Sequence, residues 1–131
     1  MNDFTKTQNA HLARLLDTLD HQLREDIVAT LLQSGYQRYI DLAGMVHDTG
    51  DESVADVLAE LDNKHVDRSL QELHDIELAR KRLAEGNIKR CMECRGEIGF
   101  ERLLAYPVAM SCFACQDQFE KTHAHEPTPR L

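Results

Sequence analysis

Leucine and isoleucine side chains recur at every third or fourth position over the first third of the chain. The apolar stripe comprises Leu12, Leu16, Leu19, Leu23, Ile27 and Leu31, and it resumes after a gap with Tyr39, Leu42 and Val46. Residues at this spacing share one face of an α-helix. The pattern predicts one long helix over about residues 9–46, with Gly35 as a candidate position for a bend.

A second stripe with helical spacing follows. It comprises Val54, Leu58, Leu61, Val66, Leu70, Leu73, Ile76 and Leu83. Its period slips once, between Leu61 and Val66, where the apolar seam would drift around a continuous helix. We expect a helix from about Glu52 to Glu85 that stops at Gly86, because glycine readily adopts the left-handed conformation that ends helices.

A short polar segment separates the two stripes. Residues 47–51 read His-Asp-Thr-Gly-Asp, which is typical of a turn, and Asp51 or Ser53 can cap the next helix. Two helices of similar length joined by a short turn indicate an antiparallel hairpin. We expect a mainly α protein in which residues 1–86 form a long antiparallel helical hairpin, a coiled coil with its tip near 47–53. Two core helices of an ordinary bundle are the alternative.

The acidic charge of the chain is concentrated in the second half of this hairpin. The net charge is −8, and residues 41–77 hold eleven acidic side chains against only Lys64 and Arg68. A DNA-binding protein needs a basic footprint to displace counterions from phosphates. We therefore expect no direct sequence-specific DNA binding, and a basic protein surface or a metal-bearing site is the better partner for this segment.

Composition and the N-terminal sequence bear on the size of the core and on the cellular compartment that we expect. Aromatic residues make up 5% of the 131 residues and tryptophan is absent, which argues against a large globular core. There is no apolar run of the roughly 20 residues that a membrane span needs. The first residues lack the basic region and apolar block of a signal peptide. The expectation is a cytoplasmic, monomeric protein without a membrane segment.

Four cysteines form the strongest motif. Cys91 and Cys94 make one C-x₂-C pair, and Cys112 and Cys115 make another after seventeen residues. Two such pairs hold one Zn²⁺ in a closed tetrahedral site with four sulfur ligands. A closed site cannot activate water, so we expect a structural metal and no enzyme. Four unconnected buried cysteines, or a redox pair, are the alternatives; a redox pair would need a βαβ pattern, which is not visible.

The last part of the chain differs from the helical hairpin. Residues 87–121 are expected to form a small C-terminal four-cysteine, zinc-ribbon-like module with short strand-like pieces such as Glu97–Phe100. A short terminal helix is predicted to start at Cys115 and reach Lys121. Residues 122–131 contain two prolines and no apolar periodicity, and we expect a flexible tail.

The cysteine block, following an acidic hairpin, resembles the DksA/TraR group of bacterial transcription factors. The resemblance covers roughly residues 45–120 and includes Glu97-Ile98-Gly99, Arg102-Leu103, Ala105-Tyr106-Pro107 and Gln116. It implies a globular zinc-bearing end from which a coiled coil projects. It also implies a protein that binds RNA polymerase rather than DNA, inserts the coiled coil into the secondary channel and acts there through acidic tip residues.

The family's tip signature, Asp-x-x-Asp-x-Ala, can be placed in two registers. Counting back from Cys91 puts it on Asp48, Asp51 and Ser53, with Glu52 adding a further acidic group. A second register starts at Asp51 and places Val54 at the second Asp and Asp56 at the Ala. The first register is preferred because it keeps both carboxylates.

Other positions depart from the family pattern. The resemblance places the family's contacts with the alarmone ppGpp at Asp75, Tyr106 and Gln116, where a highly charged anion would find no cation. It therefore implies little ppGpp dependence through that site. Arg95 stands where the family usually has glycine after the second cysteine, and a positive φ there would strain an arginine.

The leading interpretation is a zinc-stabilised regulator that binds RNA polymerase through its secondary channel. The main alternative is a zinc-ribbon adaptor whose hairpin binds another protein without any direct effect on transcription. A third hypothesis is nucleic-acid binding by the cysteine block. Its basic residues are Arg80, Lys81, Arg82, Lys89, Arg90, Arg95 and Arg102. No aromatic platform for stacking bases accompanies them.

Overall fold

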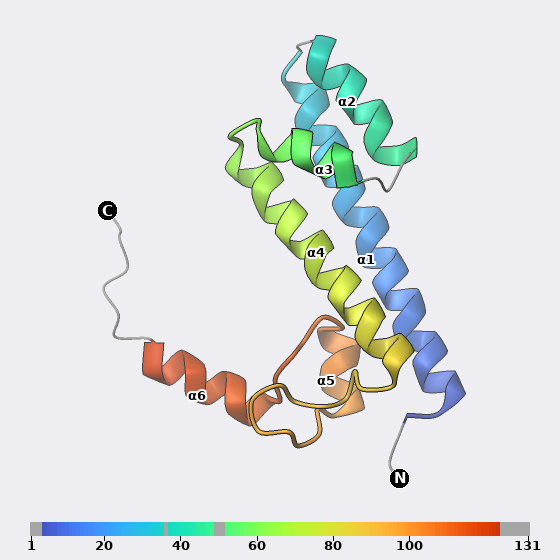
Figure 1. Ribbon diagram of the computed structural model, residues 1–131, viewed down its shortest axis with the longest axis vertical. Helices are drawn as coiled ribbons and strands as arrows, with labels where there is room; N and C mark the ends of the chain where they lie inside the picture. The colour runs from blue at the N-terminus through green and yellow to red at the C-terminus, as the bar shows by residue number, and fades with distance from the viewer. Residues whose placement is uncertain (1–3, 36, 49–51, 124–131) are drawn as a thin grey trace. The chain divides into compact units, whose positions relative to one another are not determined.

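A computed structural model of the chain describes residues 4–35, 37–48 and 52–123. Its helices are α1 (Lys6–Gln33), α2 (Gln37–Asp48), α3 (Glu52–Ala59), α4 (Lys64–Glu85), α5 (Phe100–Ala105) and α6 (Phe113–His123), as Figure 1 shows. Over these ranges the structure has no strand, and a single antiparallel bridge pairs Arg90 with Glu97. None of the helices in the described part is long and apolar enough to cross a membrane. The expected mainly α class is confirmed.

The chain divides into two compact units. Residues 14–78 form one, here called the hairpin unit, and residues 1–13 with 79–131 form the other, here called the cysteine unit. Helices α1 and α4 each contribute one end to the cysteine unit and the rest to the hairpin unit.

Helix α1 begins earlier than its apolar stripe suggests because Thr5 and Gln8 form a capping box. The Gln8 N–H donates to Thr5 Oγ1 at 3.1 Å, and the Thr5 N–H donates to Gln8 Oε1 at 2.9 Å. Two N–H groups that lack helical partners are satisfied in this way. Next to the cap, the Phe4 ring meets the Phe100 ring edge-on at 5.3 Å between centroids, which ties the start of α1 to α5 within the cysteine unit.

The predicted single helix over residues 9–46 is wrong, because α1 ends at Gln33. The N–H and the hydroxyl of Ser34 both donate to the Leu31 carbonyl, at 3.2 and 2.7 Å. Gly35 then adopts a φ of +76°, a conformation that costs little only for glycine. The local bonds and the glycine end the helix where sequence analysis placed only a bend.

The predicted single helix over residues 52–85 is also wrong. Helix α3 ends at Ala59, and Asp62 adopts a left-handed φ of 56°. Asn63 then caps α4, since its Oδ1 accepts the Val66 N–H at 3.0 Å. The slip of the apolar period between Leu61 and Val66 marks this break rather than a drifting seam.

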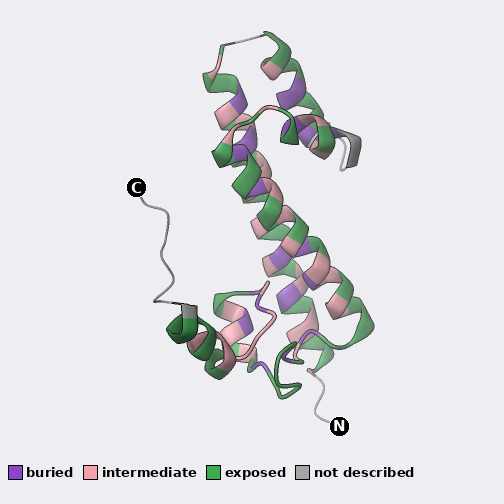
Figure 2. Ribbon diagram, turned by 60° about the vertical axis from the view of Figure 1, so that its left-hand side comes forward, coloured by how far each residue is buried: buried purple, intermediate pink, exposed green. Residues whose placement is uncertain are grey.

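One apolar core joins all four helices of the hairpin unit. Its buried members are Ile27, Leu31, Leu42, Ala43, Val46, Val54, Leu58 and Val66, seen as purple ribbon in Figure 2. Residues near the end of α1 therefore pack with the start of α4, as an antiparallel hairpin requires. Helices α2 and α3 pack against each other and fold back over α1 and α4.

Arg24 fixes the direction of α2. Its Nη1 donates to the Val46 carbonyl at 3.1 Å, and its Nε donates to Asp20 Oδ1 at 2.5 Å. The Val46 carbonyl lies in the last turn of α2 and has no partner within the helix, so a cation there is favourable. The contact places the C-terminal end of α2 beside the middle of α1.

The end of α4 follows the prediction. Gly86 has a φ of +81°. Its N–H donates to the Leu83 carbonyl at 3.2 Å, and the Asn87 N–H donates to the Arg82 carbonyl at 2.9 Å. This pair of bonds is a Schellman motif, which satisfies carbonyls at the helix end and turns the chain toward the cysteines.

Two adjacent leucines test the hairpin core. Leu31 is 1% exposed and Leu32 is 50% exposed on the same helix. Leu31→Ala should lower the free energy of unfolding by about 2–5 kcal/mol, because it opens a cavity in the shared core. Leu32→Ala should change it by less than about 0.5 kcal/mol. Urea denaturation followed by circular dichroism measures both, and equal losses would contradict this core.

Candidate metal centre

The first cysteine pair lies on a tight turn closed by backbone hydrogen bonds. The Cys91 N–H donates to the Gly96 carbonyl at 2.8 Å, and the Arg95 N–H donates to the Cys91 carbonyl at 3.0 Å. Arg95 has a φ of 65°, so the positive φ expected at this position is confirmed. A Cβ on Gly96 would lie 3.3 Å from Cys94 Sγ, which explains why a glycine follows Arg95.

The second pair lies at the start of α6. The Gln116 N–H donates to the Cys112 carbonyl at 3.0 Å, which places Cys115 in the first turn of that helix. The two turns are joined directly, because the Met92 N–H donates to the Met110 carbonyl at 2.8 Å. The predicted short terminal helix is confirmed, although it runs from Phe113 to His123 rather than from Cys115 to Lys121. Most of the expected flexible tail, residues 124–131, lies outside the described residues.

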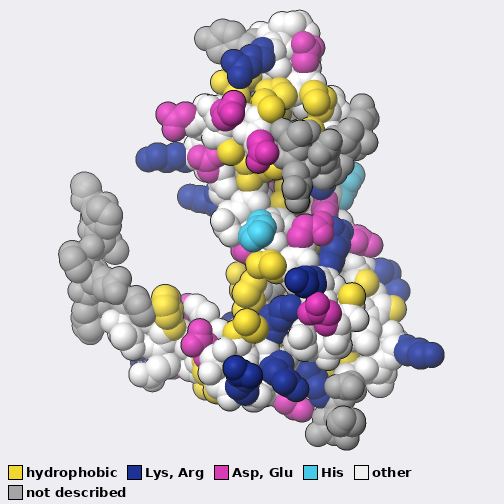
Figure 3. All heavy atoms as spheres, in the orientation of Figure 1, with side chains coloured by type: hydrophobic (Ala, Val, Ile, Leu, Met, Phe, Trp, Pro, Cys, Tyr) yellow, Lys and Arg dark blue, Asp and Glu magenta, His cyan; other side chains and the backbone are white. Residues whose placement is uncertain are grey.

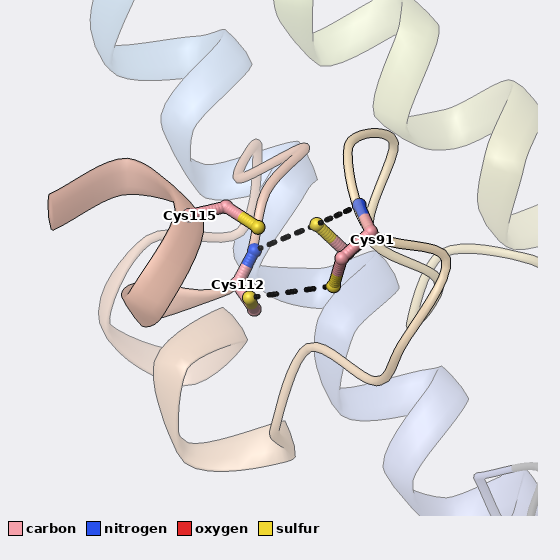
Figure 4. Close-up of side chains that lie close together, drawn as sticks. Cys91, Cys112 and Cys115 are labelled. Carbon is pink, nitrogen blue, oxygen red and sulfur yellow. Dashed lines mark hydrogen bonds between the residues drawn. The ribbon is translucent and has the colours of Figure 1, made fainter. Parts of the chain in front are cut away.

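Four sulfur atoms converge between these turns. The Sγ atoms of Cys91, Cys94, Cys112 and Cys115 all lie within 4.8 Å of one another, and Figure 4 shows three of these side chains directed at a common point. Cys94 Sγ and Cys112 Sγ are 3.9 Å apart. A tetrahedral zinc with bonds of about 2.3 Å to sulfur needs sulfur pairs about 3.8 Å apart. The four cysteines therefore fit a single tetrahedral metal ion.

The electrostatics of the cluster favour ionisation at one cysteine and oppose it at another. Burial raises the pKa of the Cys91 thiol, but the N–H groups of Cys94, Cys112 and Glu93 donate to its sulfur and lower that pKa to about 6. Hydrogen bonds with the Cys112 and Cys94 thiols, which hold its proton, raise the pKa of Cys115 to about 12. Four thiolates together thus require a cation, and metal binding must release the last proton.

Arg82 at the end of α4 holds the backbone around the cluster. Its Nη1 donates to the Ala109 carbonyl at 3.3 Å, and its Nη2 donates to the Asn87 and Ile88 carbonyls, both at 3.3 Å. The same Nη2 also donates to the Arg90 carbonyl. Burial lowers the pKa of this guanidinium, while the nearby Cys91 raises it. One planar side chain therefore joins the segments that precede both cysteine pairs.

A small apolar core supports the cluster. Ile88, Ile98, Leu103 and Ala109 are all buried. Leu103 belongs to α5, which sequence analysis missed, and the predicted strand-like Glu97–Phe100 amounts to the single bridge between Arg90 and Glu97. The missed signal is Phe-Glu-Arg-Leu-Leu-Ala at residues 100–105, which has good helix formers but is too short for a clear period.

Three of the basic residues near the cysteines, Arg82, Lys89 and Arg102, have structural partners, which weakens the nucleic-acid hypothesis. Arg102 Nε donates to the Ser111 carbonyl at 2.9 Å, and Lys89 Nζ lies 3.5 Å from Glu97 Oε1. Arg82, Arg90 and Arg95 line a hollow of about 260 Å³ beside Cys91. Figure 3 shows dark blue side chains gathered over the cysteine unit. Positive charge here offsets the two negative charges of a divalent ion with four thiolates.

The predicted tip residues are only partly covered by the structure. Asp48 is the last residue of α2, and Glu52 and Ser53 open α3, but their side chains lie outside the described part of the chain. Asp51 lies outside the described residues altogether. Both registers of the family's tip signature therefore remain predictions.

The three positions that the resemblance relates to ppGpp have ordinary local contacts. Asp75 Oδ1 accepts a hydrogen bond from Gln71 Nε2 at 3.2 Å, and Gln116 Nε2 donates to Glu120 Oε2 at 2.9 Å. Tyr106 follows α5 and is 52% exposed.

Known proteins resemble this chain over most of its length. The RNA polymerase-binding transcription factor DksA of Buchnera aphidicola subsp. Acyrthosiphon pisum is 34% identical over 112 residues, which are 85% of this chain and 70% of that protein. The factor of the same name from Escherichia coli K12 is 28% identical over 111 residues, with the same coverage. No protein-family model matches the chain.

A solved structure has the same fold. The transcription factor DksA2 from Pseudomonas aeruginosa superposes with a TM-score of 0.60 at 24% identity, covering 92% of this chain and 88% of that one.

Replacing one ligand should abolish metal loading. Cys94→Ser removes one of the four sulfurs, so the metal content of dialysed protein should fall from about one ion per chain to near zero, because a closed site binds through all its ligands. Met92→Ala, a change at a 61% exposed neighbour, should leave the metal content unchanged. Helical circular dichroism should largely survive, since the hairpin unit has its own core. Full loading of the serine variant would exclude a four-cysteine site.

Arg82 is expected to stabilise the cysteine unit without binding the metal. Arg82→Ala should lower the unfolding free energy by roughly 2–3 kcal/mol, because several carbonyls lose a charged donor. Arg82→Lys should not restore it, since an ammonium cannot span the same carbonyls. Lys81→Ala, at the exposed neighbouring position, is the matched control. Thermal unfolding and the rate of metal release to a chelator would reveal the effect, and wild-type behaviour of Arg82→Ala would refute it.

Proposed function

The chain belongs to the DksA family, and on this premise we propose that it binds RNA polymerase and regulates the initiation of transcription. The observation that carries the proposal is the 34% identity to an RNA polymerase-binding factor over 85% of the chain. An alignment of this extent includes residues of both the hairpin unit and the cysteine unit. Family membership also confirms the expectation that the chain is not an enzyme, since DksA-family transcription factors are non-enzymatic regulators.

The metal of the four-cysteine site is proposed to be one structural Zn²⁺. Four sulfur atoms within 4.8 Å of one another suit zinc, and a closed set of four ligands leaves no position for substrate or water. The ion supplies the positive charge that lets four thiolates share one space. The chain's own contribution is the two tight turns and the Arg82 contacts that hold them in place.

The hairpin is proposed to act in the secondary channel of the polymerase through Asp48, Asp51, Glu52 and Ser53. Two observations support this proposal. The acidic excess of the chain lies within residues 41–77, and the preferred register of the family signature keeps both carboxylates. A segment with this charge suits a channel that leads to Mg²⁺ and basic side chains.

Regulation by this protein is proposed to be independent of ppGpp at the family's site. Where the resemblance expects cations, this chain has the carboxylate of Asp75, the phenol of Tyr106 and the amide of Gln116. The Asp75 carboxylate in particular would repel a polyphosphate. The protein is further proposed to be a cytoplasmic monomer that contacts polymerase rather than a specific DNA sequence.

Co-purification with core RNA polymerase, followed by transcription in vitro, tests the proposal. Wild-type protein should bind and change initiation. Asp48→Ala with Asp51→Ala should still bind but lose most of that effect, because the acidic groups at the channel's end are gone. Adding ppGpp should change neither result.

The matched control removes two carboxylates elsewhere. Glu72 and Glu85 are exposed on α4, so the pair Glu72→Ala with Glu85→Ala alters net charge equally and should regulate like the wild type. If the Asp48 and Asp51 double variant regulates normally, the tip assignment is wrong. If wild-type protein never binds polymerase, the adaptor hypothesis takes the place of the regulator.

A further inference from the structure

A small hollow beside the first cysteine pair is lined by three arginines. It has a volume of about 260 Å³, and its described lining residues are Arg82, Asn87, Arg90, Cys91, Met92 and Arg95. All of them belong to the cysteine unit, and none of them is acidic. The hollow is smaller than the roughly 300–1,000 Å³ of most small-molecule pockets, so it suits a compact ligand.

Two of the three arginines carry charges that no side chain of the described chain neutralises. Arg90 and Arg95 are exposed, and their guanidinium groups form no hydrogen bond or ion pair within the described residues. Lys89, by contrast, pairs with Glu97. Each free guanidinium offers a planar pair of N–H donors, which matches two oxygens of a phosphate.

Arg82 supplies a third positive charge in a fixed position. Its Nη1 donates to the Ala109 carbonyl, and its Nη2 donates to the Asn87 and Ile88 carbonyls, each at 3.3 Å. Because these contacts already hold the guanidinium at the wall of the hollow, a ligand does not have to order it. Asn87 lines the same hollow and has an amide that can donate a further hydrogen bond.

The backbone of Arg95 argues for a role of its side chain. Its φ of 65° is left-handed, a conformation that a Cβ opposes and that glycine adopts freely. The conformation belongs to the first cysteine turn, in which the Arg95 N–H donates to the Cys91 carbonyl at 3.0 Å. Residues strained in this way gather at functional sites, and no hydrogen bond or ion pair of the Arg95 side chain within the described residues offsets the strain.

The hollow keeps its positive charge when the metal site is loaded. Residues 80–95 hold six basic side chains against two acidic ones, an excess of four positive charges. A divalent ion with four thiolates carries two negative charges, which cancel only half of that excess. A chain with a net charge of −8 therefore has a local site that attracts anions.

We propose that this hollow binds a phosphate dianion, either inorganic phosphate or the terminal phosphate of a phosphomonoester. Arg90, before Cys91, and Arg95, after Cys94, donate to its oxygens from the two ends of the first cysteine turn, while Arg82 adds its fixed charge. Three guanidiniums in one hollow favour a single doubly charged phosphate. A nucleic-acid strand instead has singly charged phosphates and needs a row of cations.

The site is separate from the positions that the resemblance relates to ppGpp. Asp75, Tyr106 and Gln116 are not among the described residues that line the hollow. The inference therefore depends on the cysteine unit alone and not on the proposed function.

Calorimetric titration of the full metal-loaded chain with inorganic phosphate tests the site. With the ionic strength held constant by potassium chloride, the wild type should bind one phosphate per chain with a Kd below about 1 mM. Arg90→Ala should weaken this binding about tenfold or more, because the anion loses a pair of charged hydrogen bonds.

Arg95→Gly separates ligand binding from folding. Glycine accepts the φ of 65°, so this variant should keep its metal and its helical circular dichroism while its phosphate affinity falls about tenfold or more. Lys81→Ala is the matched control, because it removes one positive charge from an exposed position of α4 that does not line the hollow. It should bind phosphate within about twofold of the wild type, since solvent and salt screen an exposed charge.

Adenosine monophosphate, used as a second probe, distinguishes the two sources of the phosphate. Tighter binding than that of inorganic phosphate supports a phosphomonoester ligand, and equal or weaker binding supports phosphate itself. The absence of saturable binding of either probe up to about 10 mM overturns the site. Full phosphate affinity in both Arg90→Ala and Arg95→Gly also overturns it, because the anion would then bind elsewhere. Binding of single-stranded DNA without terminal phosphates, in the absence of phosphate binding, would replace it with the nucleic-acid hypothesis.

Discussion

Four thiolates cannot share one small space without a cation, and the cysteine unit is organised around that constraint. The Cys91 sulfur accepts backbone N–H groups that favour its charge and lower its pKa, whereas neighbouring thiols hold the proton of Cys115 and raise its pKa. A bound divalent ion would resolve the conflict by replacing that proton. Arg82 joins the end of α4 to the segments that precede both cysteine pairs, so a bound metal and one guanidinium would take the place of a large apolar core.

The hairpin unit depends on a competition between continuing a helix and capping it. Around Gly35 the Ser34 bonds and a left-handed glycine end α1, although the apolar stripe continues. Around Asp62 the Asn63 side chain starts α4 anew, and the slipped stripe agrees with the break. The break at Gly35 thus interrupts a continuous apolar stripe, whereas the break at Asp62 coincides with a slip in the stripe.

The basic and acidic side chains of the protein gather in different parts of the chain. In the cysteine unit Arg82 donates to backbone carbonyls, Lys89 pairs with Glu97, and Arg90 and Arg95 line the hollow beside Cys91. Acidic charge within residues 41–77 has only two basic side chains to oppose it. The proposals that the protein contacts a basic channel of polymerase rather than DNA rest on this distribution of charge. The relation to DksA, a polymerase-binding factor, agrees with that distribution.

The features that the sequence predicted correctly are those that depend on residues close together in the chain. The two C-x₂-C pairs predicted the cluster of four cysteines, Gly86 predicted the end of α4, and Arg95 predicted a positive φ, because each depends largely on neighbours a few residues away. The ends of α1 at Gln33 and α3 at Ala59, the short α5 and the contacts of Arg82 with several carbonyls were missed. Local bonds at Ser34 and Asn63 permit the two breaks, but contacts between distant segments, such as Arg24 with Val46 and Arg82 with Ala109, hold the resulting arrangement. Only the tertiary structure could decide them, because packing determines which of two locally acceptable conformations has the lower free energy.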